Sequence, residues 1–228
     1  MVTKVRGSLA GEAMVEHGAM TANAQPLRKE DARAATDVLC AALADDPGWA
    51  HVVPDPRVRA SALQVVIGVA VRDARPFGSV QAAHVDSRLA GAAIWLPPGA
   101  FPMTWQRRAR VMPRMAALAL RAPRHMRNLA KFGSSVEAAF PDEPAWYLVV
   151  LGVAPAAQRK GVGTALMRPM LDRADQEDAA CYLETANPRN VGYYQAMGFT
   201  AVQPGAPLYD GGPPMWTMLR PPAPDTPR

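Results

Sequence analysis

The pattern of apolar and polar positions predicts helices and strands that alternate along most of the chain. Apolar residues recur at helical spacing over 30–44 and 57–71, and they form short, nearly continuous runs typical of buried strands over 89–96 and 146–153. In chain order, we expect a strand at 26–28, helices at 30–44 and 57–71, strands at 79–86, 89–96 and 146–153, a helix from 161 to about 175, a strand at 180–185, a helix at 190–197, and strands at 199–202 and 214–219. Strands that alternate with helices indicate an α/β sandwich.

The chain is expected to hold one folded domain between two irregular ends. Its 228 residues suit a single domain, which we place at 24–220. Residues 1–23 are rich in Gly, Ala and Met without a clear period, so we expect a flexible N-terminal extension. Residues 221–228 are expected to form a Pro-rich tail.

A basic stretch lies in the middle of the chain, at 105–131. It carries eight Lys or Arg residues and no acidic residue, within a chain of net charge +5. We expect Pro113 and Pro123 to divide it into short helices. Apolar residues at core-like spacing, and the lack of aromatic residues after Trp105, argue against a nucleic-acid interface. A solvated helical face is the favoured interpretation, and a surface for an anionic acceptor or partner is the alternative.

Cysteine usage and the absence of a targeting pattern predict a cytoplasmic protein without a membrane partner. Cys40 and Cys181 are too few for a disulfide framework or a zinc site, which favours two buried thiols in a reducing compartment. The N-terminal residues lack the apolar core of a signal peptide. Several prolines interrupt the uncharged stretch 89–106, which excludes a spanning helix there.

A strand, a glycine-rich turn and a helix follow one another in the last third of the chain. The strand at 146–153 leads into Gln158-x-x-Gly161-x-Gly163, where helical spacing begins. Glycines let a ligand approach the backbone, and the free N–H groups of the first helical turn attract an anion. The glycine spacing fits neither a Walker loop nor the dinucleotide fingerprint. The pattern therefore predicts a phosphate-binding turn of another kind.

This segment resembles motif A of the GNAT superfamily of N-acetyltransferases, whose Q/R-x-x-G-x-G/A turn holds the pyrophosphate of acetyl-CoA. The resemblance continues through 181–185, 187–190 and 193–199, and 143–147 resembles the puromycin N-acetyltransferase branch. It implies the GNAT fold: a central mixed, mostly antiparallel twisted sheet, flanked by helices, with a V-shaped opening between the two central strands. It further implies an acetyl-CoA-binding core at about 143–202 and an acceptor-side region at about 45–141.

The resemblance implies acetyl-CoA as co-substrate and assigns residues to its binding. Backbone groups of the strand would pair with the pantetheine arm, main-chain amides of the turn would hold the pyrophosphate, and two residues of the following helix would touch the cofactor or lie near its sulfur. The expected binding residues are Leu151, Gly152, Val153, Gln158, Arg159, Lys160, Gly161, Val162, Gly163, Thr164, Asn190 and Tyr194.

Two side chains are candidates for proton transfer. Tyr194 is the expected acid for the departing thiolate, because a phenol is protonated at neutral pH; Tyr193 is the rival if the helix phase differs. Glu184 lies within an apolar strand, where it is either the base for the amine or a hydrogen-bonded structural carboxylate. Five residues are candidates to line the acceptor site, although packing or surface exposure is the favoured interpretation of each; they are Asp46, Trp49, His51, Trp95 and Tyr147.

Together these features favour an enzyme that transfers the acetyl group of acetyl-CoA to a primary amine of a small molecule, by direct attack in a ternary complex. No metal is expected, and neither cysteine occupies a nucleophile position; Cys181 is expected to face away from Tyr182 and Glu184. The alternatives are acetylation of a protein N-terminus or lysine, and a non-catalytic module that senses acetyl-CoA. A monomer and a homodimer both remain open.

Overall fold

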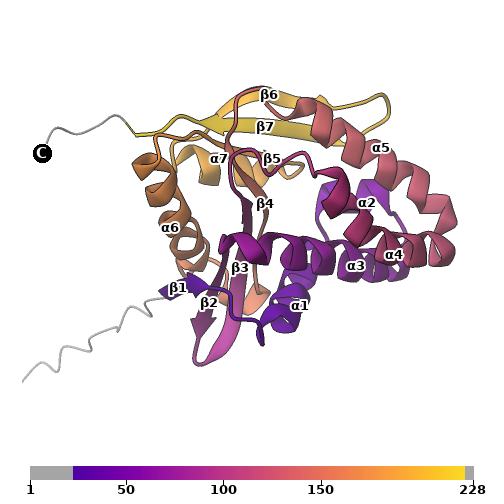
Figure 1. The fold of residues 1–228 in the computed structure, drawn as a ribbon, viewed down its shortest axis with the longest axis horizontal. Helices are drawn as coiled ribbons and strands as arrows, with labels where there is room; N and C mark the ends of the chain where they lie inside the picture. Colours follow the sequence, from indigo (N-terminus) through magenta and orange to yellow (C-terminus); the bar gives the residue numbers. More distant parts are fainter. Residues whose placement is uncertain (1–22, 224–228) are drawn as a thin grey trace, which may run out of the picture.

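The computed structural model describes residues 23–223 and contains one seven-stranded sheet. The expected N-terminal extension and the end of the Pro-rich tail lie outside the described residues. The strands follow the order β1-β2-β3-β4-β5-β7-β6 (Figure 1). Their bounds are β1 Asn23–Pro26, β2 Val80–Val85, β3 Arg88–Leu96, β4 Trp146–Val153, β5 Cys181–Thr185, β6 Thr200–Pro207 and β7 Pro214–Arg220. β4 and β5 run parallel, and the other neighbouring pairs are antiparallel, which confirms the mixed, mostly antiparallel sheet.

The parallel strands β4 and β5 separate after a short pairing. Three residues of each strand are paired, from Trp146 with Cys181 to Leu148 with Leu183. β4 then continues to Val153 along β3, beyond the reach of β5. A bulge accompanies the separation, because Ile94 pairs with Val150 whereas Trp95 pairs with Leu148. The result is the V-shaped opening that the resemblance implies.

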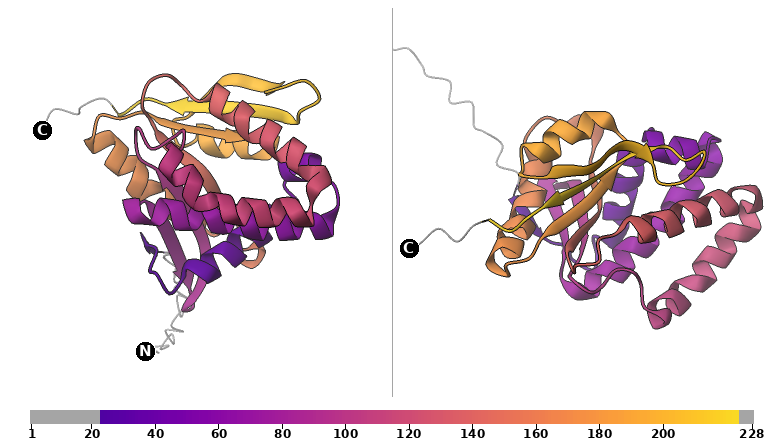
Figure 2. Two further views of the ribbon diagram at one scale, coloured as in Figure 1. Left: turned by 45° about the vertical axis from the view of Figure 1, so that its right-hand side comes forward. Right: turned by 90° about the horizontal axis from the view of Figure 1, so that it is seen from above.

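Helices cover both faces of the sheet. α1 (Ala32–Leu43) and α3 (Pro56–Ala74) pack on one face, and α6 (Val162–Gln176) and α7 (Pro188–Gln195) lie on the other (Figures 1 and 2). Alternation along β5 separates the two cores: Tyr182 belongs to the core under α1 and α3, whereas Cys181 and Leu183 belong to the core under α6. Cys181 therefore faces away from Tyr182, as expected.

Two further helices form a hairpin beside α3. α4 (Trp105–Arg121) and α5 (Pro123–Ala139) pack against α3 and the short α2 (Pro47–Val52) through a small separate core that includes Val53 and Leu118. Figure 2 shows this hairpin at the side of the molecule opposite α6. Among residues 23–223, none of the helices combines the length and apolar character that crossing a membrane requires.

The expected break at Pro113 is wrong, because α4 continues through it. Proline cannot bond to the carbonyl four residues earlier, here that of Ala109. Both residues are exposed, so water can reach this carbonyl and the helix tolerates the loss. The expected division at Pro123 is confirmed, since this residue is the first of α5.

Capping accounts for two further differences from the sequence expectation. Asp46 accepts a hydrogen bond from the Trp49 N–H (3.1 Å), and Pro47 is the first residue of α2. The Asp-Pro-Gly sequence that was expected only to end the first helix therefore also begins α2. Asn187 likewise accepts from the Arg189 N–H (3.1 Å), so α7 begins two residues earlier than expected.

The two edge strands also differ from expectation. β1 ends at Pro26 rather than running over 26–28, because a turn closed by a bond from the Asp31 N–H to the Arg28 carbonyl (3.2 Å) follows it. β6 extends to Pro207 rather than ending at 202. An edge strand tolerates proline, and the shifts in register along β6 absorb the irregularity.

Candidate active site

The free edge of β4 presents backbone groups to the V-shaped opening. The Ala154 N–H bonds to the Ala90 carbonyl of β3 (2.7 Å), so alternation directs the backbone groups of Gly152 toward β3 and those of Leu151 and Val153 away from it. Of the three expected pantetheine partners, two therefore face the opening. Gly152 instead lets α1 pack closely on β4, since a Cβ atom added to it would lie 2.8 Å from Leu39 Cδ2 in α1.

A tight turn joins β4 to α6. Arg159 (φ 60°) and Gly161 (φ 76°) adopt left-handed backbone conformations, which glycine adopts without strain. Gln158 closes the turn, because its Nε2 donates to the Val153 carbonyl (3.2 Å). The first N–H of α6 with a helical partner is that of Ala165, bonded to Gly161. The N–H groups of 162–164 precede it at the end of the helix that attracts anions.

Tyr193 packs against the first turn of α6. A Cβ atom added to Gly163 would lie 2.7 Å from the Tyr193 hydroxyl oxygen, so only glycine leaves room for this contact. That oxygen is buried and has no hydrogen-bond partner among the described residues. Burial raises the pKa of Tyr193 to about 12. The structure thus places Tyr193 beside the phosphate turn.

Tyr194, the next residue, is buried in the core under α6. Its side chain is 7% exposed, and its ring meets that of Tyr193 edge-on, with centroids 5.3 Å apart. Burial raises its pKa above the usual range, and the charges of Tyr193, Asp46 and Glu184 raise it further. Tyr194 therefore keeps its proton at neutral pH and lies within electrostatic reach of both carboxylates.

Glu184 lies on β5 just beyond the last residue paired with β4. Tyr147, on β4, donates a hydrogen bond to its Oε1. Its Oε2 is buried and has no partner among the described residues. Burial raises the pKa of Glu184 to about 8, although the bond from Tyr147 opposes this rise. The carboxyl group can therefore exchange a proton near neutral pH.

The start of α2 borders the site on the face of the sheet that α1 covers. A Cβ atom at Gly48 would lie 2.8 Å from Ala186 Cβ, so this turn rests on the end of β5. Burial raises the pKa of Asp46. The buried Arg59 holds the segment in place, because it donates to the carbonyls of Ala44 (2.8 Å), Val53 (2.9 Å) and Pro54 (3.0 Å). Sequence reasoning missed Arg59, although an arginine four residues before Leu63, in line with the apolar stripe of 57–71, was a usable signal.

Asn190 and the two basic residues of the turn lie around the same opening but are less constrained. Asn190 Nδ2 makes a long bond of 3.4 Å to Thr185 Oγ1, at the end of β5. Arg159 and Lys160 are exposed. Nothing among the described residues fixes their side chains, so they are available to an arriving anion.

The remaining candidates for the acceptor side take different places. Trp95 is fully buried in the core under α6, on the opposite face of the sheet from Tyr147, as the favoured packing interpretation predicts. Trp49, within α2, is half-buried, and His51 Nε2 bonds to the Gly211 carbonyl (2.8 Å) in the turn between β6 and β7. An aromatic cluster surrounds Tyr147; its other members are Phe101, Phe140 and Tyr182.

Neither cysteine is placed to act as a nucleophile. Both are buried free thiols; burial raises the pKa of Cys40 to about 11 and that of Cys181 to about 12. A thiol that stays protonated is a poor nucleophile.

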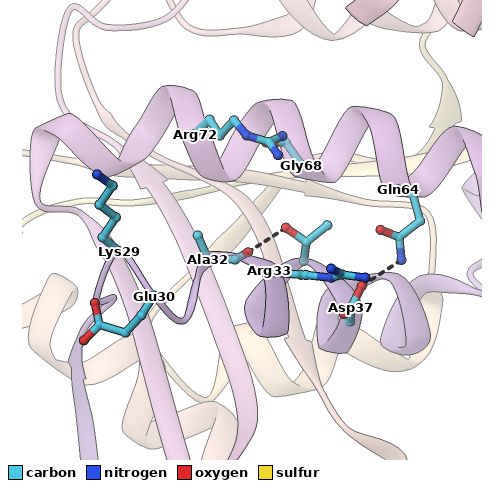
Figure 3. A pocket seen from close by; sticks show the side chains of 9 residues that line it. Lys29, Glu30, Ala32, Arg33, Asp37, Gln64, Gly68 and Arg72 are labelled. Atoms are coloured by element: carbon cyan, nitrogen blue, oxygen red, sulfur yellow. Dashed lines mark hydrogen bonds between the residues drawn. The ribbon is translucent and has the colours of Figure 1, made fainter.

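Two surface hollows lie apart from this constellation. The larger, about 620 Å³, is a groove between α1 and α3 that mixes acidic and basic side chains (Figure 3). A bond from Gln64 Nε2 to Asp37 Oδ1 (3.1 Å) crosses it. The smaller, about 350 Å³, lies against Phe101 and Phe140. Neither is lined by the turn at 158–164, Glu184 or Tyr194.

Comparison with known proteins relates this arrangement to acetyltransferases. The sequence model of the acetyltransferase (GNAT) family matches residues 116–199. An uncharacterized N-acetyltransferase of Schizosaccharomyces pombe is 37% identical over 62 residues, which are 27% of this chain and 25% of the yeast protein. The chain thus spans about a quarter of that relative.

Solved structures share the fold over nearly the whole chain. A crystal structure described as histone acetyltransferase HPA2 and related acetyltransferase from Corynebacterium glutamicum has a TM-score of 0.67 and 25% identity, covering 91% of this chain and 99% of its own. A polyamine N-acetyltransferase of Drosophila melanogaster has a TM-score of 0.55 and 16% identity, covering 87% and 98%.

Proposed function

We propose that this chain, which the GNAT family model matches over residues 116–199 and which shares its fold with a related acetyltransferase, transfers the acetyl group of acetyl-CoA to a primary amine of a small molecule, by direct attack in a ternary complex. One observation carries this proposal: Glu184, a buried carboxylate with a raised pKa, lies just beyond the point where β4 and β5 separate, and its charge reaches the buried phenol Tyr194, whose neighbour Tyr193 packs on the first turn of α6.

The opening and the turn fit the two ends of acetyl-CoA. The N–H groups at the start of α6, with Arg159 and Lys160 beside them, suit a pyrophosphate. The backbone groups of Leu151 and the N–H of Val153, which point away from β3, suit the amide groups of a pantetheine arm, which would lie along β4 like an additional strand. Asn190 would bind the cofactor beyond the end of β5. Tyr193, packed on Gly163, fixes the turn from behind.

The proton transfers follow from the two pKa shifts. The amine nitrogen attacks the carbonyl carbon of the thioester; a C–N bond forms and the C–S bond breaks. Glu184 accepts the proton that the amine nitrogen loses, directly or through water, and its pKa of about 8 suits a base at neutral pH. Tyr194 donates a proton to the leaving thiolate, and the raised pKa keeps that proton available. A backbone N–H near Val153 would polarise the carbonyl.

The acceptor is proposed from the sequence resemblance. The stretch 143–147 resembles the puromycin N-acetyltransferase branch, so aminonucleosides are the first acceptors to test. Solved structures with this fold include enzymes named for histone and for polyamine substrates, so the fold itself does not select between protein and small-molecule acceptors. A protein acceptor and a sensor without turnover are therefore the alternatives. Cytoplasmic location remains part of the proposal, consistent with two buried free thiols.

Thiol release from acetyl-CoA across a panel of amines tests the proposal. The panel holds puromycin-like aminonucleosides, aminoglycosides, polyamines, arylamines and basic peptides. Acceleration by one small-molecule class supports the proposal and identifies the acceptor. Acceleration by peptides alone supports a protein acceptor. Tight binding of acetyl-CoA with no acceleration by any amine would contradict turnover and favour the sensor.

A further inference from the structure

The turn between β6 and β7 (residues 208–213) lies at the end of β5 where β5 separates from β4. β7 pairs antiparallel with β5, and Trp216 lies opposite Thr185, the last residue of β5, so the chain before Trp216 continues past that end. The start of α2 rests on Ala186 at the same end. Leu208 packs against the core under α1 and α3. The turn therefore borders the opening on the face of the sheet that α1 and α3 cover.

The proposed base points to the same face. Tyr182 belongs to the core under α1 and α3, and Glu184 follows it by two residues on β5, so both side chains lie on one side of the sheet. Helix α5 also reaches this face, because the Tyr182 hydroxyl donates to the carbonyl of its last residue, Ala139 (3.1 Å). An amine that approaches Glu184 from this face therefore passes beside α2, α5 and the turn.

Two side chains fasten the turn to these helices. His51, on α2, donates from Nε2 to the Gly211 carbonyl (2.8 Å). Lys131, on α5, donates from Nζ to the Asp210 carbonyl (3.1 Å), and its ammonium group lies 4.6 Å from the centroid of the Tyr209 ring. We call these contacts the turn latch. Figures 1 and 2 show the end of the β6–β7 hairpin beside α5, and since α2 and α5 also contact each other, the three elements form a continuous wall beside the opening.

The turn is packed on itself, whereas its connection to the sheet is interrupted. The Gly212 N–H bonds to the Tyr209 carbonyl (2.9 Å), and a Cβ atom at Gly212 would lie 3.0 Å from Tyr209 Cε1. The pairing of β6 with β7 shifts register between Gln203 and Ala206, where Gly205 has a φ of 67°. The end of the hairpin can therefore move as a unit, and the latch bonds that hold it are exposed to water, so each contributes little.

We propose that the turn latch limits the acceptor to a compact amine: His51 and Lys131 hold the turn beside the approach to Glu184, and its release admits larger molecules. This inference rests on the proposed function and adds residues that determine which acceptors enter. Both donors bind main-chain carbonyls, so they fix where the turn lies. They act on the acceptor through the turn and are positioning residues. A peptide acceptor would need the turn displaced, because it requires an open groove.

Hydrogen exchange measures whether the latch holds the turn. His51→Ala and Lys131→Ala together should speed amide exchange over 208–213 at least about tenfold, the effect of losing two hydrogen bonds that favour the closed turn. Thr200→Val is the matched control, because it removes an exposed bond to the Leu219 carbonyl (3.2 Å) at the other end of the same hairpin and should leave this exchange unchanged. His51→Gln and Lys131→Arg keep a donor and should restore slow exchange.

Labelling of the Glu184→Cys variant measures access to the site without turnover. Cys40 and Cys181 are buried and have raised pKa values, so they react slowly. Iodoacetamide should react at a rate that the latch does not change, whereas a maleimide attached to polyethylene glycol should react slowly. Removing the latch with His51→Ala and Lys131→Ala should speed the bulky reagent at least about tenfold, for the reason given for exchange.

Turnover supplies the readout for substrates. In the protein with Glu184 intact, the double variant His51→Ala with Lys131→Ala should raise kcat/KM for a basic peptide relative to that for a small amine. The dissociation constant of acetyl-CoA should stay within about twofold of the wild-type value, because the latch lies on the acceptor side. A latch that only stabilises the fold would lower the thermal midpoint and leave this ratio unchanged.

Two results would overturn the proposal. The first is unchanged exchange over 208–213 in the double variant, because the two bonds would then not hold the turn. The second is a released turn with no gain in labelling by the bulky reagent and no change in acceptor preference. Failure of the proposed function is a separate result: no amine would accelerate thiol release, while exchange and labelling would still decide whether the latch controls access.

Discussion

The hydroxyl oxygen of Tyr193 lies 2.7 Å from the position that a Cβ atom at Gly163 would occupy. The contact couples α7 to the first turn of α6, where the phosphates of acetyl-CoA are proposed to bind. It also distinguishes the two adjacent tyrosines, since Tyr193 faces the phosphate turn whereas Tyr194 lies near Glu184 and Asp46. The Tyr193 side chain thus explains why position 163 is a glycine, in addition to the access that a glycine gives to a ligand.

Gly163→Ala should therefore weaken acetyl-CoA binding and destabilise the protein by about 1–3 kcal/mol, because the methyl group and the Tyr193 hydroxyl compete for one space. Tyr193→Phe removes that oxygen and leaves the ring atom Cζ at 3.4 Å, an ordinary contact. The cost of Gly163→Ala should accordingly fall in the Tyr193→Phe background, as measured by thermal unfolding and calorimetric titration with acetyl-CoA. Equal costs in both backgrounds would show that the two residues are not coupled.

Glu184→Gln should lower turnover by about 10²-fold or more and abolish the rise of rate with pH. The base must be deprotonated, and the pKa of Glu184 is raised to about 8 by burial, so the wild-type rate should rise with pH and level off above about 8. The measurement is a pH–rate profile with a saturating acceptor whose own amine pKa lies far from 8. Glu143→Gln, at an exposed position, is the matched control.

The same variant has a second readout that does not depend on activity. A carboxyl group whose pKa is higher in the folded than in the unfolded state stabilises the fold below the unfolded value of about 4.5, and this contribution is lost as pH rises toward about 8. The thermal midpoint of the wild type should therefore fall over this range more than that of Glu184→Gln. Parallel curves would mean that Glu184 is ionised normally in the folded protein.

Tyr147→Phe should shift the wild-type pH–rate profile to higher pH. The hydrogen bond from Tyr147 stabilises the Glu184 carboxylate and lowers its pKa, so its loss lets burial raise that pKa further. Tyr182→Phe is the control, since Tyr182 belongs to the same aromatic cluster but donates to the Ala139 carbonyl. A profile that moves equally in both variants would assign the shift to packing rather than to the bond.

Arg59→Met should destabilise the protein by more than about 2 kcal/mol and lower the rate further than stability alone explains. It leaves three carbonyls around α2 without their donor, and an unsatisfied buried group costs about 1–3 kcal/mol. The segment that carries Asp46 would then move relative to β5. Denaturant unfolding measures the first effect and thiol release the second; Arg57→Met, exposed on the same helix, should change neither.

Much of the fold could be predicted because it depends on short-range patterns. The buried strand at 146–153 is as predicted, because its apolar run is bounded by a clear turn. The start of α2 was missed because an Asp-Pro-Gly sequence stops one helix and caps the next with the same residues. Pro113 was misjudged because the cost of a proline depends on whether water reaches the freed carbonyl, which tertiary structure decides.

The proposed site was predicted only in part, because some of its contacts are local in sequence and others join distant residues. The turn at 158–163 is local in sequence, so its glycines and charges could be recognised directly. The bond from Tyr147 to Glu184 joins residues 37 positions apart, and the contribution of Asp46 depends on Arg59 holding α2 against β5. Trp95 stayed a candidate for the acceptor side, with packing favoured, because residue type does not reveal which face of a strand is covered by which helix.

Turnover of Tyr194→Phe, measured by thiol release at saturating acetyl-CoA with the dissociation constant of acetyl-CoA determined in parallel, tests the central claim most directly. If Tyr194 protonates the leaving thiolate, turnover should fall by about 10²-fold or more while the dissociation constant stays within about twofold of the wild-type value. Unchanged turnover would remove Tyr194 as the acid and contradict the proposed mechanism.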